Sequence, residues 1–177
     1  HGSSAASDVY KRQVINLLYD SNHSMKVNYG WNLSSSDWLI RIYLSGGSPR
    51  EVIFNNSKIM QAYIFGDGSG NSFRFCVDDN LPNSSSSNHE VSPWIVIDWV
   101  GWKLVSWDMS MDGTGSWIGD GNLDGNMRFD SFQLKYNHGQ SQFGNIYIDD
   151  FRIADNVILS NHETNFEQPF SLGGNFP

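Results

Sequence analysis

Residues 72–78, with the sequence SFRFCVD, carry the pattern that decides the fold. Phe73, Phe75 and Val77 alternate with Arg, Cys and Asp, so the large apolar side chains recur with a period of two. Successive side chains of a strand point to opposite faces. This period therefore predicts a β-strand with one face in the core.

The same period recurs along the chain, between short stretches of turn-forming residues. The strand-like segments are residues 24–31, 38–45, 58–65, 94–99, 103–109, 130–136 and 145–153. Glycine-rich turns such as residues 66–70 separate them, and no amphipathic helix of three turns is evident. About eight short strands with this spacing predict an all-β, two-sheet antiparallel β-sandwich with the strand order of a jelly roll.

The composition fits one domain of this kind. The chain has 177 residues, of which 39% are hydrophobic, so it is long enough to bury a single core. Its net charge of -8, without any Lys/Arg cluster, predicts that it binds no nucleic acid, and it leaves neutral glycans as compatible partners. No apolar stretch approaches the ~20 residues of a membrane helix, so no membrane insertion is expected. Cys76, the only cysteine, lies in an apolar run and is expected to be a buried thiol.

The two ends lack the alternation of the middle. Residues 1–13 are small, polar and without a period, and we expect them to be a non-native or disordered leader outside the fold. The sandwich is expected to span residues 14–159. Residues 160–177 are expected to be a linker.

The end of the chain has a recognisable order of residues. Pro169, Leu172, Asn175, Phe176 and Pro177 resemble the opening of the type IX secretion sorting domain. The resemblance implies export by a Gram-negative bacterium, with an extracellular or cell-surface location. The linker would then lead into a sorting domain that is truncated here.

Three segments follow one another in a familiar order. They are GDGSGNSFRFCVDD at residues 66–79, IDWVGWKLV at 97–105 and NIYIDDFRI at 145–153. Together they resemble the galactose-binding-like carbohydrate-binding modules appended to secreted bacterial glycan-active enzymes. The resemblance implies a non-catalytic β-sandwich beside an upstream catalytic domain, with a polysaccharide or glycoconjugate as partner and often one structural calcium ion.

Some aromatic and polar residues lie in loops or on the strand face that points away from the core, and these are candidates for glycan binding. Sugar rings stack on aromatic planes, while polar neighbours bind the hydroxyls. The candidates are Arg41, Tyr43, Arg74, Asp78, Trp102 and Trp117. An ordinary solvent-facing or loop-packing role is the alternative for each of them.

Two places are candidates for the calcium ion. Asp120, Asn122 and Asp124, followed by Gly125, match the first half of a calcium loop. The twelfth position of that loop is Ser rather than a bidentate Glu, and simple turn formation is the alternative. Asp149 is a second candidate, because in the resembled family calcium often joins the last strand to the first.

The sequence nominates no catalytic site. It contains no nucleophile elbow, no helical His spacing for zinc, and no carboxylate pair on one face of a strand. We therefore expect a binding module rather than an enzyme, with a structural spacer without ligand and a catalytic jelly roll such as a polysaccharide lyase as alternatives. Exposed aromatics beside polar groups would favour binding, a smooth charged surface the spacer, and a buried cluster of His, Tyr, Arg or Lys the enzyme.

Overall fold

The computed structural model of the chain describes residues 15–16, 24–35, 38–43, 52–82 and 85–155. Every regular element in this part is a β-strand, except the short 3₁₀ helix η1 (Ser86–Asn88). The strands are β1 (Ile15–Asn16), β2 (Met25–Gly30), β3 (Leu39–Ile42), β4 (Lys58–Asp67), β5 (Ser72–Leu81), β6 (His89–Val91), β7 (Ile95–Val96), β8 (Val100–Asp108), β9 (Asn126–Lys135) and β10 (Phe143–Asp155). The predicted leader (1–13) and linker (160–177) lie outside the described residues, so the domain boundaries stay predictions.

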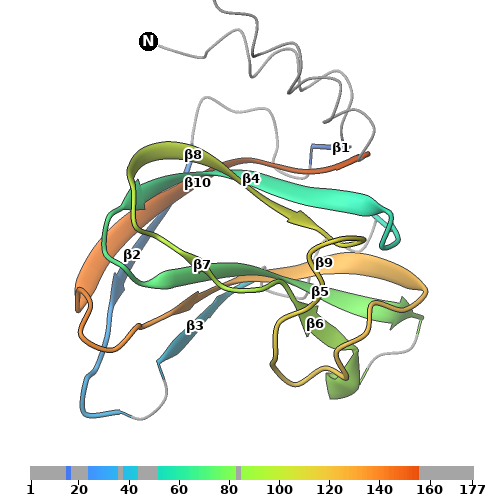
Figure 1. The fold of residues 1–177 in the computed structure, drawn as a ribbon, viewed down its shortest axis with the longest axis horizontal. Helices are drawn as coiled ribbons and strands as arrows, with labels where there is room; N and C mark the ends of the chain where they lie inside the picture. Colours follow the sequence, from blue (N-terminus) through green and yellow to red (C-terminus); the bar gives the residue numbers. More distant parts are fainter. Residues whose placement is uncertain (1–14, 17–23, 36–37, 44–51, 83–84, 156–177) are drawn as a thin grey trace, which may run out of the picture.

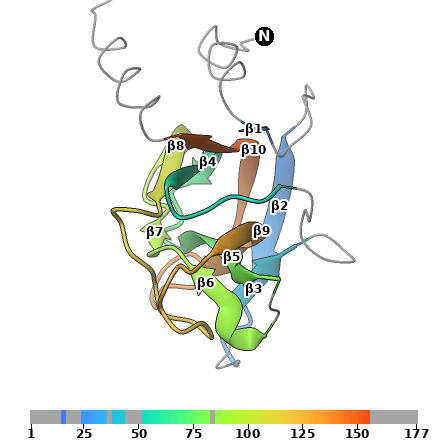
Figure 2. The same ribbon diagram turned by 90° about the vertical axis from the view of Figure 1, so that its right-hand side faces the viewer.

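The strands form two antiparallel sheets that lie face to face (Figure 1). In sheet A, β10 pairs with β4 along one edge and with both β1 and β2 along the other, and β4 also pairs with β8. In sheet B, β9 lies between β3 and β5, and the far edge of β5 pairs with β6 and β7. The view in Figure 2 again separates β4, β8 and β10 from β5, β6 and β9.

The chain crosses repeatedly between the two sheets. Strands β2, β4, β8 and β10 belong to sheet A, while β3, β5, β6 and β9 belong to sheet B. The order β2-β10-β4-β8 facing β3-β9-β5-β6 is that of a jelly roll. The predicted all-β, two-sheet antiparallel sandwich is therefore confirmed.

The connection from β4 to β5 is the tight turn that its glycines predict. Gly68 and Gly70 have positive φ angles of 66° and 72°, which glycine adopts without strain. The backbone N–H of Ser69 donates to Asp67 Oδ1 at 3.0 Å, and the Tyr29 hydroxyl donates to Asp67 Oδ2 at 2.7 Å. These bonds tie the turn to β2, so the chain passes from sheet A to sheet B within a few residues.

The core lies between the sheets and consists of the apolar faces that the alternation predicts. Phe75 is fully buried and Trp107 is 1% exposed. Phe129, Phe132 and Phe151 pack with ring centroids 4.4 to 5.0 Å apart, which joins β9 to β10 across the sandwich. Aromatic contacts of this kind stabilise a core by about 0.5–1.5 kcal/mol beyond the burial of their area.

Two short strands of sheet B differ from expectation. The predicted strand at residues 94–99 is reduced to β7, and β6 was not predicted. Neither element is long enough to show a reliable alternation. Both pair with the edge of β5, and η1 leads directly into β6.

Candidate functional site

The outer face of sheet B, the face turned away from the core, is largely covered rather than open. Arg74, Cys76 and Asp78 leave the core face of β5 as their parity predicts, yet their exposed fractions are 2%, 0% and 8%. Facing solvent is therefore excluded as the alternative role for Arg74 and Asp78. Cys76 is the buried free thiol that the sequence predicts.

Over Arg74 the cover comes from the long connection between β8 and β9. After β8 this connection leaves sheet A and runs past β6 in sheet B (Figure 1). The backbone N–H of Gly115 donates to the carbonyl of Val91 at 2.7 Å, and the Ser116 carbonyl accepts from Arg74 Nη1 at 3.0 Å. These two bonds hold the connection against β6 and against the outer face.

A β-bulge in β9 determines which polar side chains point to this face. Cys76 pairs with Ser131, whereas the next residue of β5, Val77, pairs with Phe129, so Asp130 is an extra residue in β9. A bulge turns two neighbouring side chains toward one side of a sheet. Accordingly, Ser131 Oγ donates to Asp130 Oδ2 at 2.6 Å, although the two residues are adjacent.

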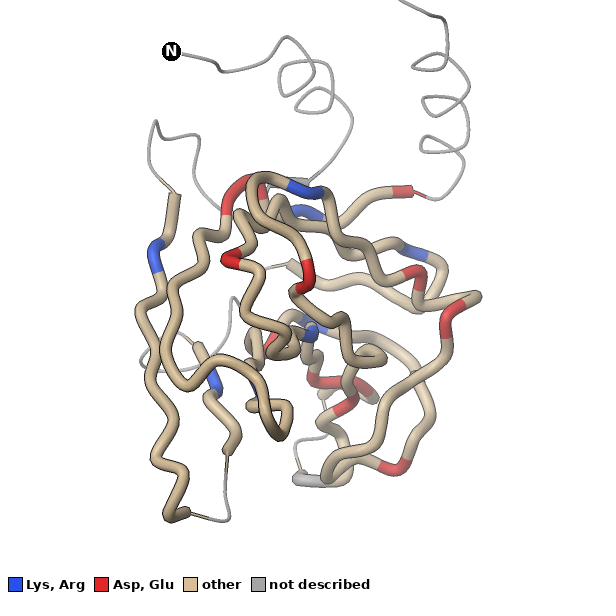
Figure 3. Tube along the Cα trace, turned by 60° about the vertical axis from the view of Figure 1, so that its left-hand side comes forward, with Lys and Arg blue, Asp and Glu red and all other residues tan. Residues whose placement is uncertain are grey.

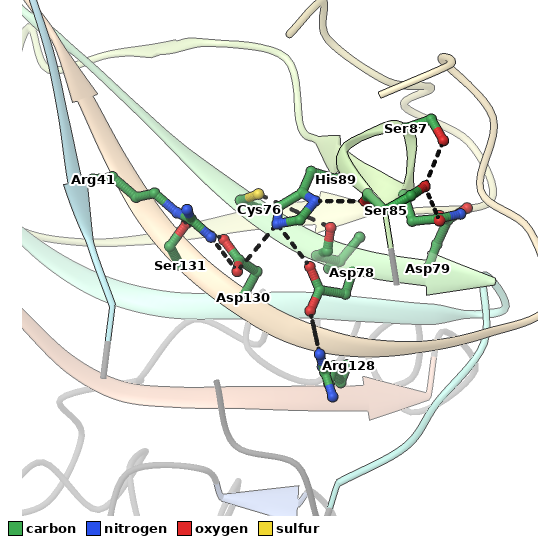
Figure 4. Close-up of polar contacts among 12 residues, drawn as sticks. Arg41, Cys76, Asp78, Asp79, Ser85, Ser87, His89, Arg128, Asp130 and Ser131 are labelled. Carbon is green, nitrogen blue, oxygen red and sulfur yellow. Dashed lines mark hydrogen bonds and ion pairs between the residues drawn. The ribbon is translucent and has the colours of Figure 1, made fainter. Parts of the chain in front are cut away.

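Two arginine–carboxylate pairs flank a histidine on this face, and Figure 4 shows how their side chains converge. Arg41 binds both carboxylate oxygens of Asp130, with 3.1 Å between Nε and Oδ2. Arg128 binds Asp78 Oδ2 at 2.9 Å through Nε and at 2.8 Å through Nη2. Between them, His89 Nε2 lies 3.2 Å from Asp78 Oδ1 and 3.9 Å from Asp130 Oδ1.

The pKa values of this network follow from burial and pairing. Burial alone would raise the pKa of Asp130, but the hydrogen bonds from Ser131 and Arg41 lower it below its ordinary value. Burial would lower the pKa of Arg41, and the bond to Asp130 leaves it raised. Burial, and then the charge of Asp130, raise the pKa of Cys76 well above its ordinary value, so this thiol is a poor nucleophile.

Aromatic rings lie over the arginines of the same face. The Arg41 guanidinium carbon lies 5.0 Å from the ring centroid of Tyr43 and 5.6 Å from that of Trp117. Trp117 is also 6.0 Å from the Arg74 guanidinium and 5.8 Å from the His89 ring. The structure therefore brings together Arg41, Tyr43, Arg74, Asp78 and Trp117, five of the candidates from the sequence.

Trp102 lies elsewhere, on the outer face of sheet A. It is 50% exposed, which agrees with its position outside the core parity. Its ring centroid lies 5.5 Å from that of Phe65, which lies 5.7 Å from that of Tyr147, and Lys26 Nζ is 5.5 Å from the Tyr147 ring. Trp102 thus belongs to a cross-strand aromatic row on the opposite side of the sandwich.

The predicted calcium positions are engaged in hydrogen bonds within the protein. Asp120 Oδ1 accepts from the backbone N–H of Asn122 at 2.9 Å, and the backbone N–H of Asp124 donates to Asp79 Oδ2 at 2.8 Å. Asp149 Oδ1 accepts from the backbone N–H of its neighbour Asp150 at 2.7 Å. The bonds of Asp120 and Asp149 fit local turns, and the bond of Asp124 ties this loop to β5; calcium at either place stays a prediction.

A different group in the described residues has the geometry of metal ligands. One potential ligand atom each from Asp78, His89 and Asp130 lies within 4.8 Å of the others, and among the described residues no further group of three or more His, Cys, Asp or Glu does so. His89 and Asp130 were missed by sequence reasoning. They lie far apart in the sequence, and only the pairing of β5 with β6 and β9 brings them to Asp78.

The surroundings of His89 limit its chemistry. Its Nδ1 lies 3.2 Å from the Ser85 carbonyl, and its Nε2 faces the two carboxylates. A general base needs a free ring nitrogen within reach of a substrate proton. Both ring nitrogens of His89 are directed at protein groups instead.

The charges of the described part do not form a surface that would bind a polyanion. Figure 3 shows the Lys and Arg positions scattered along the described trace, and two of those at sheet B, Arg41 and Arg128, are paired with carboxylates. No helix in the part of the chain that the structure describes is long and apolar enough to cross a membrane.

No protein-family model matches the chain, and no curated protein matches it in sequence.

Proposed function

We propose that this chain is a non-catalytic carbohydrate-binding module whose ligand binds the outer face of sheet B around Trp117. The observation that carries the proposal is the setting of Trp117. Its partly exposed ring lies 5.6 Å from the Arg41 guanidinium, 6.0 Å from that of Arg74 and 5.8 Å from the His89 ring. Of these neighbours Arg41 is partly exposed, with a side-chain exposure of 33%, and an indole beside such a fixed hydrogen-bond donor is an arrangement that recognises a sugar ring and its hydroxyls.

Tyr43 extends this surface on the other side of Arg41. Its side chain is 60% exposed and its ring centroid lies 5.0 Å from the Arg41 guanidinium. Arg41 is held in place by Asp130 and by a 3.3 Å hydrogen bond to Ser131 Oγ. A donor fixed in this way loses little conformational entropy when a ligand binds, which favours affinity.

The position of the functional groups supports a binding role over a catalytic one. Cys76 is buried with a raised pKa, and both ring nitrogens of His89 face protein atoms. The sequence resemblance at residues 66–79 and 97–105 supports an accessory module next to an upstream catalytic domain. The resemblance at residues 169–177 supports a secreted or cell-surface protein of a Gram-negative bacterium.

A glycan-array screen followed by calorimetry tests the proposal. Trp117→Ala should weaken binding of the best neutral glycan by about 1–3 kcal/mol, or about 5- to 150-fold, while the fold stays intact by circular dichroism. Trp102→Ala is the matched control, because it removes an exposed Trp from the opposite face. Loss of binding in Trp102→Ala alone would move the site to sheet A. The absence of binding to any glycan at millimolar concentration would favour a structural spacer.

A catalytic jelly roll, such as a polysaccharide lyase, is the second candidate, because His89, Arg41 and Tyr43 lie on one face. Incubating the protein with each bound glycan and analysing the products separates the two candidates. A binding module leaves the chain length of the glycan unchanged. New chain ends that disappear in His89→Gln would establish the enzyme instead.

A further inference from the structure

We propose that Asp78, His89 and Asp130 form a binding site for one divalent first-row metal ion, with Zn²⁺ as the best fit. The inference is independent of glycan binding. It rests on the convergence of these side chains from β5, β6 and β9 on the outer face of sheet B (Figure 4).

The distances between the potential ligand atoms approach those of a metal centre. Zn²⁺ binds imidazole nitrogen at about 2.0–2.1 Å and carboxylate oxygen at about 2.0–2.2 Å, so two tetrahedral ligand atoms lie about 3.4 Å apart. His89 Nε2 is 3.2 Å from Asp78 Oδ1 and 3.9 Å from Asp130 Oδ1. An ion fits among the three atoms with small side-chain movements.

The second ring nitrogen of His89 orients the imidazole for this role. Nδ1 lies 3.2 Å from the Ser85 carbonyl oxygen, which can only accept a hydrogen bond. This contact places the proton of the neutral ring on Nδ1 and leaves the lone pair of Nε2 directed at the carboxylates. Metal-binding histidines are typically fixed by such a bond to a backbone carbonyl.

The hydrogen bonding of the Asp78 carboxylate is a second, independent indication of a metal site. Its Oδ1 is buried and accepts no hydrogen bond, while its Oδ2 is occupied by Arg128. The 3.2 Å contact to His89 Nε2 has the distance of an ion pair but not the alignment of a hydrogen bond. A buried carboxylate oxygen without a hydrogen bond is costly, and a metal ion beside it would remove that cost.

The two arginines orient the aspartates and reduce the affinity of the site, while the ligand types determine which metal ion it prefers. Arg128 holds Asp78 and Arg41 holds Asp130, as hydrogen-bonded outer partners hold the carboxylates of metal centres. Their positive charges offset the charges of the two aspartates, which weakens the attraction for any cation. One imidazole with two carboxylates favours Zn²⁺ or Mn²⁺ over the all-oxygen sites of Ca²⁺.

Equilibrium dialysis and calorimetry of the chelator-treated protein with Zn²⁺ test the site. We expect about one Zn²⁺ per chain, with binding weakened at least about 10-fold in His89→Gln and in Asp78→Asn. His138→Ala is the matched control, because His138 is exposed and outside the group. It should bind Zn²⁺ like the unchanged protein.

A thermal melt supplies the second readout, because an ion that binds only the folded state raises the midpoint. Zn²⁺ should raise the midpoint of the unchanged protein and of His138→Ala, but not that of a folded His89→Gln. Zinc binding that persists in His89→Gln would place the metal elsewhere and overturn the inference. Absence of Zn²⁺ binding to the unchanged protein would leave His89 as an ion-pair partner of the aspartates and would also overturn it.

Discussion

The guanidinium carbon of Arg74 lies 3.9 Å from the ring centroid of Trp94, and Lys135 Nζ lies 4.8 Å from the same ring. Arg74 is 2% exposed, and burial lowers its pKa to about 10. Its polar contacts in the described residues are neutral oxygens, at Gln133 and Ser116. The aromatic ring therefore takes part of the role that a carboxylate has for Arg41.

Arg74→Lys should destabilise the fold, although the charge is kept. Lysine cannot reproduce the bonds to Gln133 Oε1 at 2.8 Å and to Ser116 O at 3.0 Å, nor the planar contact with Trp94. We expect a loss of about 2 kcal/mol in urea denaturation. Lys103, on sheet A, is exposed and lies 4.5 Å from the Trp99 ring, so Lys103→Ala should cost less than about 1 kcal/mol. Equal losses in the two variants would contradict this account of Arg74.

Trp107→Ala should remove a central part of the core. Trp107 is 1% exposed, and its Nε1 donates to the carbonyl of Gly113 at 2.9 Å. Loss of a buried aromatic costs about 3–5 kcal/mol, and the denaturation midpoint should fall accordingly. Trp102→Ala, at a 50% exposed position, should stay within about 1 kcal/mol of the unchanged protein. A large loss in Trp102→Ala would show that the row with Phe65 and Tyr147 is structural.

Asp130→Asn should destabilise the protein in a pH-dependent way. The folded-state pKa of Asp130 is lowered, so its charge stabilises the fold above the ordinary pKa, and this contribution is lost as the pH falls through the folded-state value. With a side chain only 6% exposed, we expect a deficit of about 3 kcal/mol at pH 7. The deficit should shrink below about pH 4.

Urea denaturation at several pH values measures this difference. Asp155 pairs with Lys58 but has a 54% exposed side chain, so Asp155→Asn is the matched control and should change stability little at any pH. A deficit of Asp130→Asn that is independent of pH would indicate a packing effect rather than the loss of a charge.

The predicted structural calcium is open to a direct measurement. An ion held at residues 120–124 or at Asp149 would raise the melting midpoint in excess Ca²⁺ relative to chelator, by mass action on the folded state. Asp124→Asn and Asp149→Asn, measured separately, would show which place binds it. Superimposable melts with Ca²⁺ and with chelator would remove this prediction.

The strands could be predicted because their alternation is local. Phe75, Trp107 and Leu134 lie in the core at the positions that their parity predicts. The burial of Arg74 could not be predicted in the same way, because residues 109–125 show no hydrophobic periodicity that would indicate where they pack. Their path over sheet B is fixed by backbone bonds such as Gly115 to Val91.

The candidate site was only partly accessible to sequence reasoning. Arg41, Tyr43 and Trp117 could be selected because they leave the core parity or lie in a loop. Asp130 could not, because alternation cannot locate the bulge that turns it to the same side as Ser131. His89 lies in a strand of three residues, and its carboxylate partners are identified only by the pairing of sheet B.

The place of β10 in sheet A has a consequence for how the chain is made. The strand spans 13 residues at the end of the described sandwich and pairs with β1, β2 and β4. Among the described strands, β1 and β2 therefore have no partner in this sheet until β10 has been made, whereas β4 can pair earlier with β8. Contacts between distant parts of a chain form slowly, and unpaired strand edges invite aggregation meanwhile. Sheet A should consequently be completed only after β10 has left the ribosome, and chaperones that hold nascent chains should raise the yield of the domain.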